Sequence, residues 1–305
     1  MASQFEEIGR RLKAYRMGRG LTADAIAEEL GISRAAVYRI EMGGVVKIET
    51  LDRLAVVLET TVASLLGAGV EYYANPISYF ERMRQVEAEA DQVIAHFPPL
   101  SYLLTSNAFR SYQKRTLLES LPSDIDIVAA ERDIDTIISI LDERKQSSQR
   151  RRLSVVNFVN LLEIERWLKL GIVGRFDLSG AELAERRRAA RAEVEHLITL
   201  IESEPMGIQI GLIEETLPNT AFQLFRTADK TYLGVSPFRL GGDLPNIRSG
   251  VAMMTADVEP VRLYETLVED LWRRALKGRD AADLLHRVLD RSAISITPRR
   301  RAANS

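Results

Sequence analysis

The part of this chain best suited to chemical recognition is residues 22–41, TADAIAEELGISRAAVYRIE. Apolar residues recur there at helical spacing on both sides of Gly31-Ile32-Ser33, which predicts two short helices joined by a tight turn. That layout is typical of a helix-turn-helix, whose second helix enters the major groove of DNA. The chemistry expected of it is hydrogen bonding to base edges and phosphates.

Residue types that usually carry out catalysis form no recognisable arrangement in this sequence. His96, His196 and His286 are far apart and lack the spacing of metal ligands. There is no Cys, which excludes disulfides and thiolate metal sites. Neither a phosphate-binding loop nor a nucleophile elbow is present. We therefore predict no metal site, no cofactor and no enzymatic activity.

Composition describes an ordinary globular protein of 305 residues, with 46% hydrophobic and 28% charged residues. No apolar run approaches the roughly 18 residues of a membrane span. The charged N-terminus lacks the apolar core of a secretory signal, so we expect a cytoplasmic protein that does not contact membranes. The net charge is −2, and residues 1–67 hold nine basic and nine acidic residues. Any DNA-binding face must therefore come from how these charges are arranged.

Helical periodicity continues on both sides of residues 22–41. Ser3 and Glu6 have the spacing of a capping box at the start of the chain, and Gly43-Gly44 ends the helix that Ser33 begins. The sequence predicts five helices, over about 3–19, 22–30, 33–42, 50–58 and 62–66.

These five segments resemble the Cro and lambda-repressor type of helix-turn-helix domain, often called the XRE family. The resemblance rests on IGRRLKAYRMGRGLT, IAEELGISRAAVYRIE and ETLDRLAVVLETTVASLL and spans residues 5–66. It implies an all-α, five-helix, lambda-repressor-like DNA-binding domain over residues 1–67. The partner implied is a double-stranded DNA operator.

The same resemblance assigns roles to individual side chains. Recognition-helix residues face base edges in the family, and an Arg can form two hydrogen bonds to guanine. The implied DNA-binding residues are Thr22, Ser33, Arg34, Ala35, Tyr38, Arg39 and Lys47. Thr22 and Ser33 are also helix caps, and Lys47 is placed to meet the DNA backbone. The alternatives are that Arg34 and Arg39 are simple solvated charges and that Tyr38 packs on its own domain.

Other positions of the motif bear on stability and on phosphate contacts. Arg16 and Glu41 match a pair that forms a structural salt bridge in the family. The family usually has Gln where Ala23 stands, and often Asn or Arg where Met42 stands. These two departures leave the exact phosphate contacts open.

Residues 68–77 are expected to be a linker to a regulatory and dimerisation domain over 78–291, followed by a disordered basic tail over 292–305. Helices are predicted over about 78–96, 124–149, 155–170, 180–202, 260–278 and 281–290. Alternating segments at 207–214, 220–226, 231–235 and 247–254 predict strands separated by short turns. We therefore expect an α+β domain with a small antiparallel sheet packed by helices.

One stretch of this region combines aromatic and arginine side chains. A pocket walled by them would suit a small anionic effector, because the guanidinium fork matches a carboxylate. The residues predicted for it are Phe222, Phe225, Arg226, Phe238, Arg239 and Arg248. An aromatic core with arginines paired to nearby acids is the alternative.

Two further features of the larger domain have more than one interpretation. The basic run Arg144, Lys145, Arg150, Arg151 and Arg152 is either a second DNA contact or a solvated helix end. The apolar helices at 124–149 and 264–276 suit a homodimer interface or a core within one chain.

Together these features favour a homodimeric DNA-binding transcription regulator whose larger domain senses a small molecule. The alternative is an antitoxin-like regulator whose larger domain binds a partner protein. An enzyme that regulates its own gene is the least supported reading, because catalytic motifs are missing.

Overall fold

The computed structural model describes residues 4–241 and 244–294 and begins with five short helices. They are α1 (Gln4–Gly18), α2 (Ala23–Leu30), α3 (Arg34–Glu41), α4 (Ile48–Val57) and α5 (Val62–Leu66). The predicted five-helix N-terminal region is therefore confirmed. Ser3, predicted to cap the first helix, lies outside the described residues.

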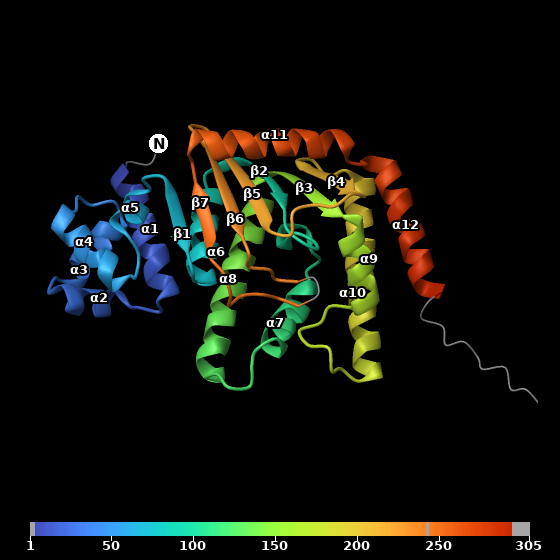
Figure 1. The fold of residues 1–305 in the computed structure, drawn as a ribbon, viewed down its shortest axis with the longest axis horizontal. Coiled ribbons are helices and arrows are strands. Elements are labelled where there is room, and N and C mark those ends of the chain that lie inside the picture. Colours follow the sequence, from blue (N-terminus) through green and yellow to red (C-terminus); the bar gives the residue numbers. More distant parts are fainter. Residues whose placement is uncertain (1–3, 242–243, 295–305) are drawn as a thin grey trace, which may run out of the picture.

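The rest of the described chain is built around a seven-stranded mixed sheet (Figure 1). The strands are β1 (Val70–Tyr73), β2 (Ala90–His96), β3 (Ser154–Asn160), β4 (Ile208–Ile213), β5 (Ala221–Thr227), β6 (Thr231–Ser236) and β7 (Ala252–Thr255). Their order is β1-β7-β6-β5-β2-β3-β4, with β2, β3 and β4 parallel and the remaining pairs antiparallel. The expected small antiparallel sheet is wrong in size and in strand direction.

Strands β2 and β3 were not predicted from the sequence, because both faces of each strand are largely buried. The helix predicted over 78–96 is helix α6 (Pro76–Glu87) followed by β2, and that over 155–170 is β3 followed by helix α9 (Leu161–Leu170). In β3, Val155 and Val159 pack into one core while Val156 and Phe158 pack into another. A strand buried on both sides shows no polar alternation, so its apolar run looks like a buried helix.

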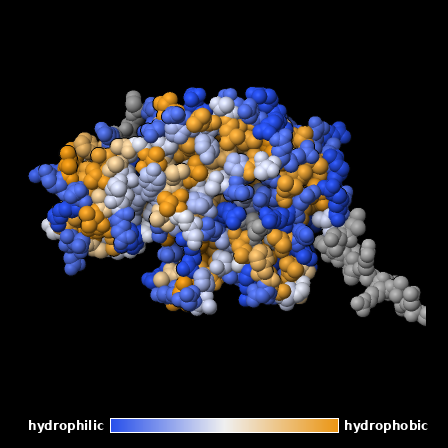
Figure 2. Space-filling view, viewed as in Figure 1, coloured by the Kyte–Doolittle hydropathy of each residue, from blue (hydrophilic) through white to orange (hydrophobic). Residues whose placement is uncertain are grey.

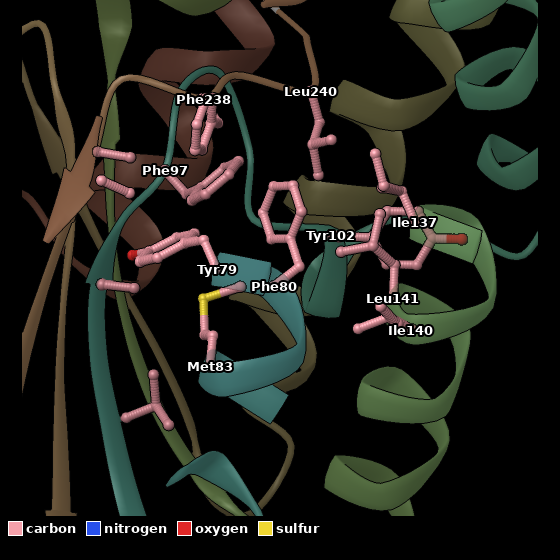
Figure 3. Close-up of a cluster of buried hydrophobic side chains, with 14 of the residues drawn as sticks. Tyr79, Phe80, Met83, Phe97, Tyr102, Ile137, Ile140, Leu141, Phe238 and Leu240 are labelled. Atoms are coloured by element: carbon pink, nitrogen blue, oxygen red, sulfur yellow. The ribbon is translucent and has the colours of Figure 1, made fainter. Parts of the chain in front are cut away.

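Helices cover both faces of the sheet. Helix α11 (Val258–Arg274) lies across one face, and α6, α8 (Ile127–Arg151) and α10 (Gly180–Ser203) form the layer on the other (Figure 1). Between these helices and the sheet, Tyr79, Phe97 and Phe238 gather on one side of Phe80, and Ile137 and Leu141 of α8 lie on its other side (Figure 3). The remaining helical segments are η1 (Tyr102–Leu104), α7 (Phe109–Glu119) and α12 (Gly278–Ile294).

The helices proposed for a dimer interface are used for packing within the chain. Helix α8 buries Ile134, Ile137 and Leu141, and α11 buries Val268 and Leu271. The tail predicted from residue 292 is outside the described residues from 295 onward, and α12 extends to Ile294. No described helix is both long and apolar enough to cross a membrane.

The segment expected to be a linker is structured. Its residues Val70–Tyr73 form β1, which pairs in register with β7 from Val70↔Thr255 to Tyr73↔Ala252. Pro76 starts α6, which packs along α1. The sequence does not predict this strand, because Glu71 is polar and interrupts the apolar pattern. In the structure the Glu71 side chain is buried.

A buried ionic cluster joins α1 to the sheet. It consists of Glu7 and Arg11 from α1, Glu71 from β1 and Arg82 from α6. Arg82 donates to Glu71 through Nε at 2.9 Å and to Glu7 through Nη2 at 2.9 Å. Arg11 Nε donates to the second oxygen of Glu71 at 2.5 Å. The helical domain is thus fixed to the sheet by ion pairs that are largely shielded from water.

The electrostatics of this cluster favour the charged forms. Burial alone would raise the pKa of Glu71, but the guanidinium groups of Arg82 and Arg11 outweigh it and lower this pKa to about 2. Hydrogen bonds from Arg82 and Tyr73 act in the same direction. The pKa of Glu7 is lowered for similar reasons, since Arg82 and Arg11 outweigh its burial.

Glu71→Gln should lower the free energy of unfolding by about 3–5 kcal/mol, because it leaves two buried guanidinium groups without their shared carboxylate. Glu59→Gln is the matched control, since it breaks only the exposed pair with Arg19 and should cost roughly 0–1 kcal/mol. Urea unfolding followed by circular dichroism measures both. Equal losses in the two variants would contradict a central role for the buried cluster.

The same cluster predicts a pH dependence of stability. The pKa of Glu71 is depressed in the folded state, so its contribution is complete above its ordinary pKa of 4.5 and is lost as pH falls toward 2. Urea midpoints of the wild type should therefore fall between these pH values. The fall should be smaller in Glu71→Gln, and an identical pH profile for the two proteins would contradict the assignment.

Candidate nucleic-acid interface

The turn between α2 and α3 is fixed by two caps and one glycine. Thr22 accepts a hydrogen bond from the amide of Ala25, and Ser33 accepts one from the amide of Ala36, both at 3.1 Å. Gly31 ends α2 with φ +64°, in the left-handed region that favours glycine. Both predicted caps are present, and they set the angle at which α3 leaves the turn.

Helix α3 has one buried and one exposed face. Val37 and Ile40 are buried in the helical core. The exposed residues include every position predicted to contact bases or phosphate on this helix and its cap, namely Ser33, Arg34, Ala35, Tyr38 and Arg39. Thr22 and Lys47 are exposed on the flanking segments. The structure therefore leaves all of the predicted DNA-binding residues accessible to solvent.

Arg34 is already engaged within its own domain. Its guanidinium lies 3.4 Å from Asp24, donates to the Tyr38 hydroxyl at 3.2 Å and sits 5.3 Å from the centre of the Tyr38 ring. These contacts raise the pKa of Arg34, with the Tyr38 hydrogen bond as the largest cause and Asp24 next. Asp24 is a contributor that sequence reasoning missed, because the turn brings it to α3 from another helix.

Arg39 and Lys47 differ from Arg34 in having their cationic groups unengaged. Neither side chain forms a hydrogen bond or ion pair within residues 4–241 and 244–294. Both can therefore meet an incoming polyanion without first breaking an internal contact. Figure 2 shows that the end carrying α2–α4 mixes hydrophilic and hydrophobic residues.

The salt bridge implied between Arg16 and Glu41 is formed. Arg16 donates to the two carboxylate oxygens at 2.5 and 3.1 Å and to the carbonyl of Leu21 at 3.0 Å. It ties α1 to the end of α3. Arg16 and Glu41 are thus structural, and neither belongs to the exposed face.

The two departures from the family pattern have different structural settings. Ala23 is buried in the helical core, so it cannot take the place of a phosphate-gripping Gln. Met42 is exposed immediately after α3, and its uncharged side chain cannot form an ion pair with a DNA phosphate. Of the residues that the resemblance implies for phosphate contact, Ser33 and Lys47 are both exposed.

The basic run at the end of α8 is mostly structural. Arg144 is buried and donates to Glu87 at 2.6 Å, and Lys145 donates to the carbonyl of Ser106 at 3.1 Å. Arg151 donates to the carbonyls of Glu87 and Ala90 at 2.9 and 2.6 Å. Arg150, Arg151 and Arg152 are exposed. Arg144 and Lys145 are buried and hold α8 to its neighbours, so the five residues do not form one exposed basic surface.

The predicted effector residues do not form one site. Side chains alternate along β5, so Phe222 packs with Tyr264 of α11 while Phe225 faces the opposite core. Phe238 lies in that opposite core, 6.3 Å from Tyr79 between ring centres (Figure 3). The aromatic wall expected around an anion is therefore split between two filled cores.

The three predicted effector arginines are also apart. Arg226 bonds Gln92 at 3.0 Å and Glu265 at 3.3 Å. Arg239 and Arg248 line two different cavities. Of the histidines, His96 is buried and its pKa is lowered by desolvation. No cluster of metal-binding side chains occurs among the described residues.

Comparison with known proteins finds one match, for the helical domain. Residues 7–66 match a family model described as a helix-turn-helix domain, as the resemblance to the XRE family implied. The rest of the chain matches no family model. Neither the curated proteins nor the solved structures yielded a match to the chain.

Ser33→Ala should lower the free energy of unfolding by about 1 kcal/mol, because the amide of Ala36 loses its cap. Ser33→Asn keeps a capping oxygen and should be close to wild type. Urea unfolding compares them. A loss of the same size in both variants would show that Ser33 does not act as a cap.

Proposed function

We propose that this protein is a cytoplasmic, homodimeric transcription regulator that binds a specific DNA operator, and that its sheet domain senses a small-molecule effector. The observation that carries the DNA-binding part is the outward face of α3 in a domain that matches a helix-turn-helix model. Arg39 lies there with its guanidinium unengaged by the described residues, and Lys47 follows in the next loop.

The geometry supports different roles for Arg34 and Arg39. Asp24 and Tyr38 hold Arg34 in one arrangement, so it reaches DNA already oriented but partly neutralised. Arg39 is unpaired and supplies the stronger attraction for an acceptor pair on guanine. Lys47 supplies a phosphate contact that carries no sequence information.

The homodimer follows from how such helices read DNA. A single recognition helix covers one half-site, and two-fold related copies read half-sites about one helical turn, or roughly 34 Å, apart. Helices α8 and α11 bury most of their apolar residues within the chain, but Ile127, Val128, Val258 and Leu263 stay exposed and are available to a second copy. We propose that the protein acts by binding and carries no catalytic activity.

Arg39→Ala should weaken specific operator binding by about 5–150-fold, the equivalent of roughly 1–3 kcal/mol, and relax specificity at one base pair. Lys47→Ala should weaken specific and non-specific DNA about equally and reduce the salt slope by about 1. Gel shifts over genomic fragments at several salt concentrations measure both.

Arg273→Ala is the matched control for these gel shifts, because Arg273 is an exposed arginine on α11, remote from α3. It should bind DNA like the wild type. Equal binding by Arg39→Ala and Arg273→Ala, or no sequence-selective binding at all, would remove the proposal.

A second candidate function, binding of a partner protein, is favoured by exposed apolar residues beside α3. Met42, Val45 and Ile48 are 82%, 74% and 75% exposed within one short segment. Co-purification of a partner at fixed stoichiometry, lost in Val45→Ser, would support this function. A monodisperse homodimer without a partner, seen by light scattering, would support the regulator instead.

A further inference from the structure

A cavity of ≈ 440 Å³ opens beyond the carboxyl ends of the parallel strands. His96 is the last residue of β2 and Asn160 the last of β3, and both line this cavity. Residues 216–219, which follow β4, form another part of its wall. Ligands of open α/β sheets bind outside the carboxyl ends of the strands, so the cavity occupies a favourable place in the fold.

Two buried polar side chains hold the wall of the cavity in place. The ring nitrogens of His96 lie 3.3 Å from the carbonyl oxygen of Phe158 and 3.2 Å from that of Pro218. Asn160 donates to the carbonyl of Glu215 at 2.7 Å while its oxygen caps the start of α9. The loop after β4 is therefore fixed to the ends of β2 and β3, which gives a pre-formed cavity rather than a gap between mobile loops.

Cationic side chains from two directions line this cavity. Lys169 and Arg166 come from α9, and Arg239 comes from the segment after β6. The backbone of Arg239 is fixed by paired hydrogen bonds with Asn246 at 2.9 and 2.8 Å. The Lys169 ammonium and the Arg239 guanidinium have no hydrogen-bond or ion-pair partner in the described part of the chain.

Two carboxylates also reach the cavity and limit what it can bind. Glu165 is paired with Arg291 of α12 at 2.8 Å, which leaves Glu163 as the acid facing the space. The N-terminal end of α9 adds positive potential at the same edge. Among the charged lining side chains that have no hydrogen-bond or ion-pair partner within the described residues, the two cations Lys169 and Arg239 outnumber the one carboxylate, Glu163, which favours an anion.

We propose that this cavity binds a small metabolite through a carboxylate or phosphate group held by Arg239 and Lys169. Arg239 supplies a planar fork for two oxygens, and Lys169 supplies a point charge beside it. This deepens the sensing part of the proposed function and rests on it only for the role of the ligand as an effector. Arg239 alone is shared with the effector site expected from the sequence.

Isothermal titration calorimetry of the full chain tests the site, with inorganic phosphate and citrate as separate probes. We expect at least one probe to bind at one site per chain, and the better probe identifies the oxyanion. Arg239→Gln and Lys169→Gln should each weaken that binding about tenfold or more, because each removes a charge-assisted contact. Arg273→Gln, outside the cavity, should bind like the wild type. Circular dichroism establishes that all variants are folded.

Binding of neither probe, or equal binding by Arg239→Gln and the wild type, would overturn the proposal. A gel shift separates this outcome from failure of the regulator. Anion binding without operator binding would keep the site and remove its role in regulation. Operator binding without anion binding would remove this site alone.

Discussion

The arrangement of the molecule depends on burying four charged groups where α1 meets the sheet. Glu7, Arg11, Glu71 and Arg82 come from three elements, and the Arg82 side chain is fully buried. Taking such groups out of water costs several kcal/mol each, and their mutual attraction offsets this only in good geometry. The cluster therefore forms only when α1, β1 and α6 are all in place, so it favours one docking of the helical domain over others.

This docking leaves the exposed face of α3 uncovered by the sheet domain. Helix α1 turns its charged face toward α6 and β1, while Arg16 on the same helix fixes the end of α3 through Glu41. The exposed face of α3 is thus held relative to the sheet through the buried ionic cluster and the Arg16–Glu41 salt bridge, which both involve α1. In the dimeric regulator proposed above, a rigid connection of this kind would turn a change in the sheet domain into a change in the spacing of the two recognition helices.

The cavity proposed as the anion site lies at the end of the sheet that is remote from the helical domain. It sits at β2, β3 and β4, while the helical domain adjoins β1, and the strand order places β7, β6 and β5 between them. A small ligand can shift DNA binding only if it prefers one of two conformations. The cavity and the helical domain are at opposite ends of a seven-stranded sheet, so a ligand-induced change would have to move packed helices and strands together. The alternative is that the ligand alters the contact between two copies of the chain.

The sequence was most informative where structure is local. The helices of residues 4–66, the caps Thr22 and Ser33 and the exposed face of α3 all follow from spacing within a few residues. Strands β4, β5 and β6 were visible from alternation and turns. Strands β2 and β3 were not, since both faces are buried and their pairing joins residues about sixty positions apart, as in Val93↔Val155. The anion cavity was missed for the same reason, because His96, Asn160 and Arg239 meet only after the sheet has formed.

The pairing of charges explains how a helical domain without net charge can bind DNA. Arg11 and Arg16 are neutralised inside the structure, and Arg34 is paired with Asp24 on the surface. Arg39 and Lys47 are exposed and have no hydrogen-bond or ion-pair partner among residues 4–241 and 244–294. A domain with as many acidic as basic residues gains little non-specific affinity for DNA from counterion release. Any sequence selectivity of this domain then has to come from contacts between side chains and base edges.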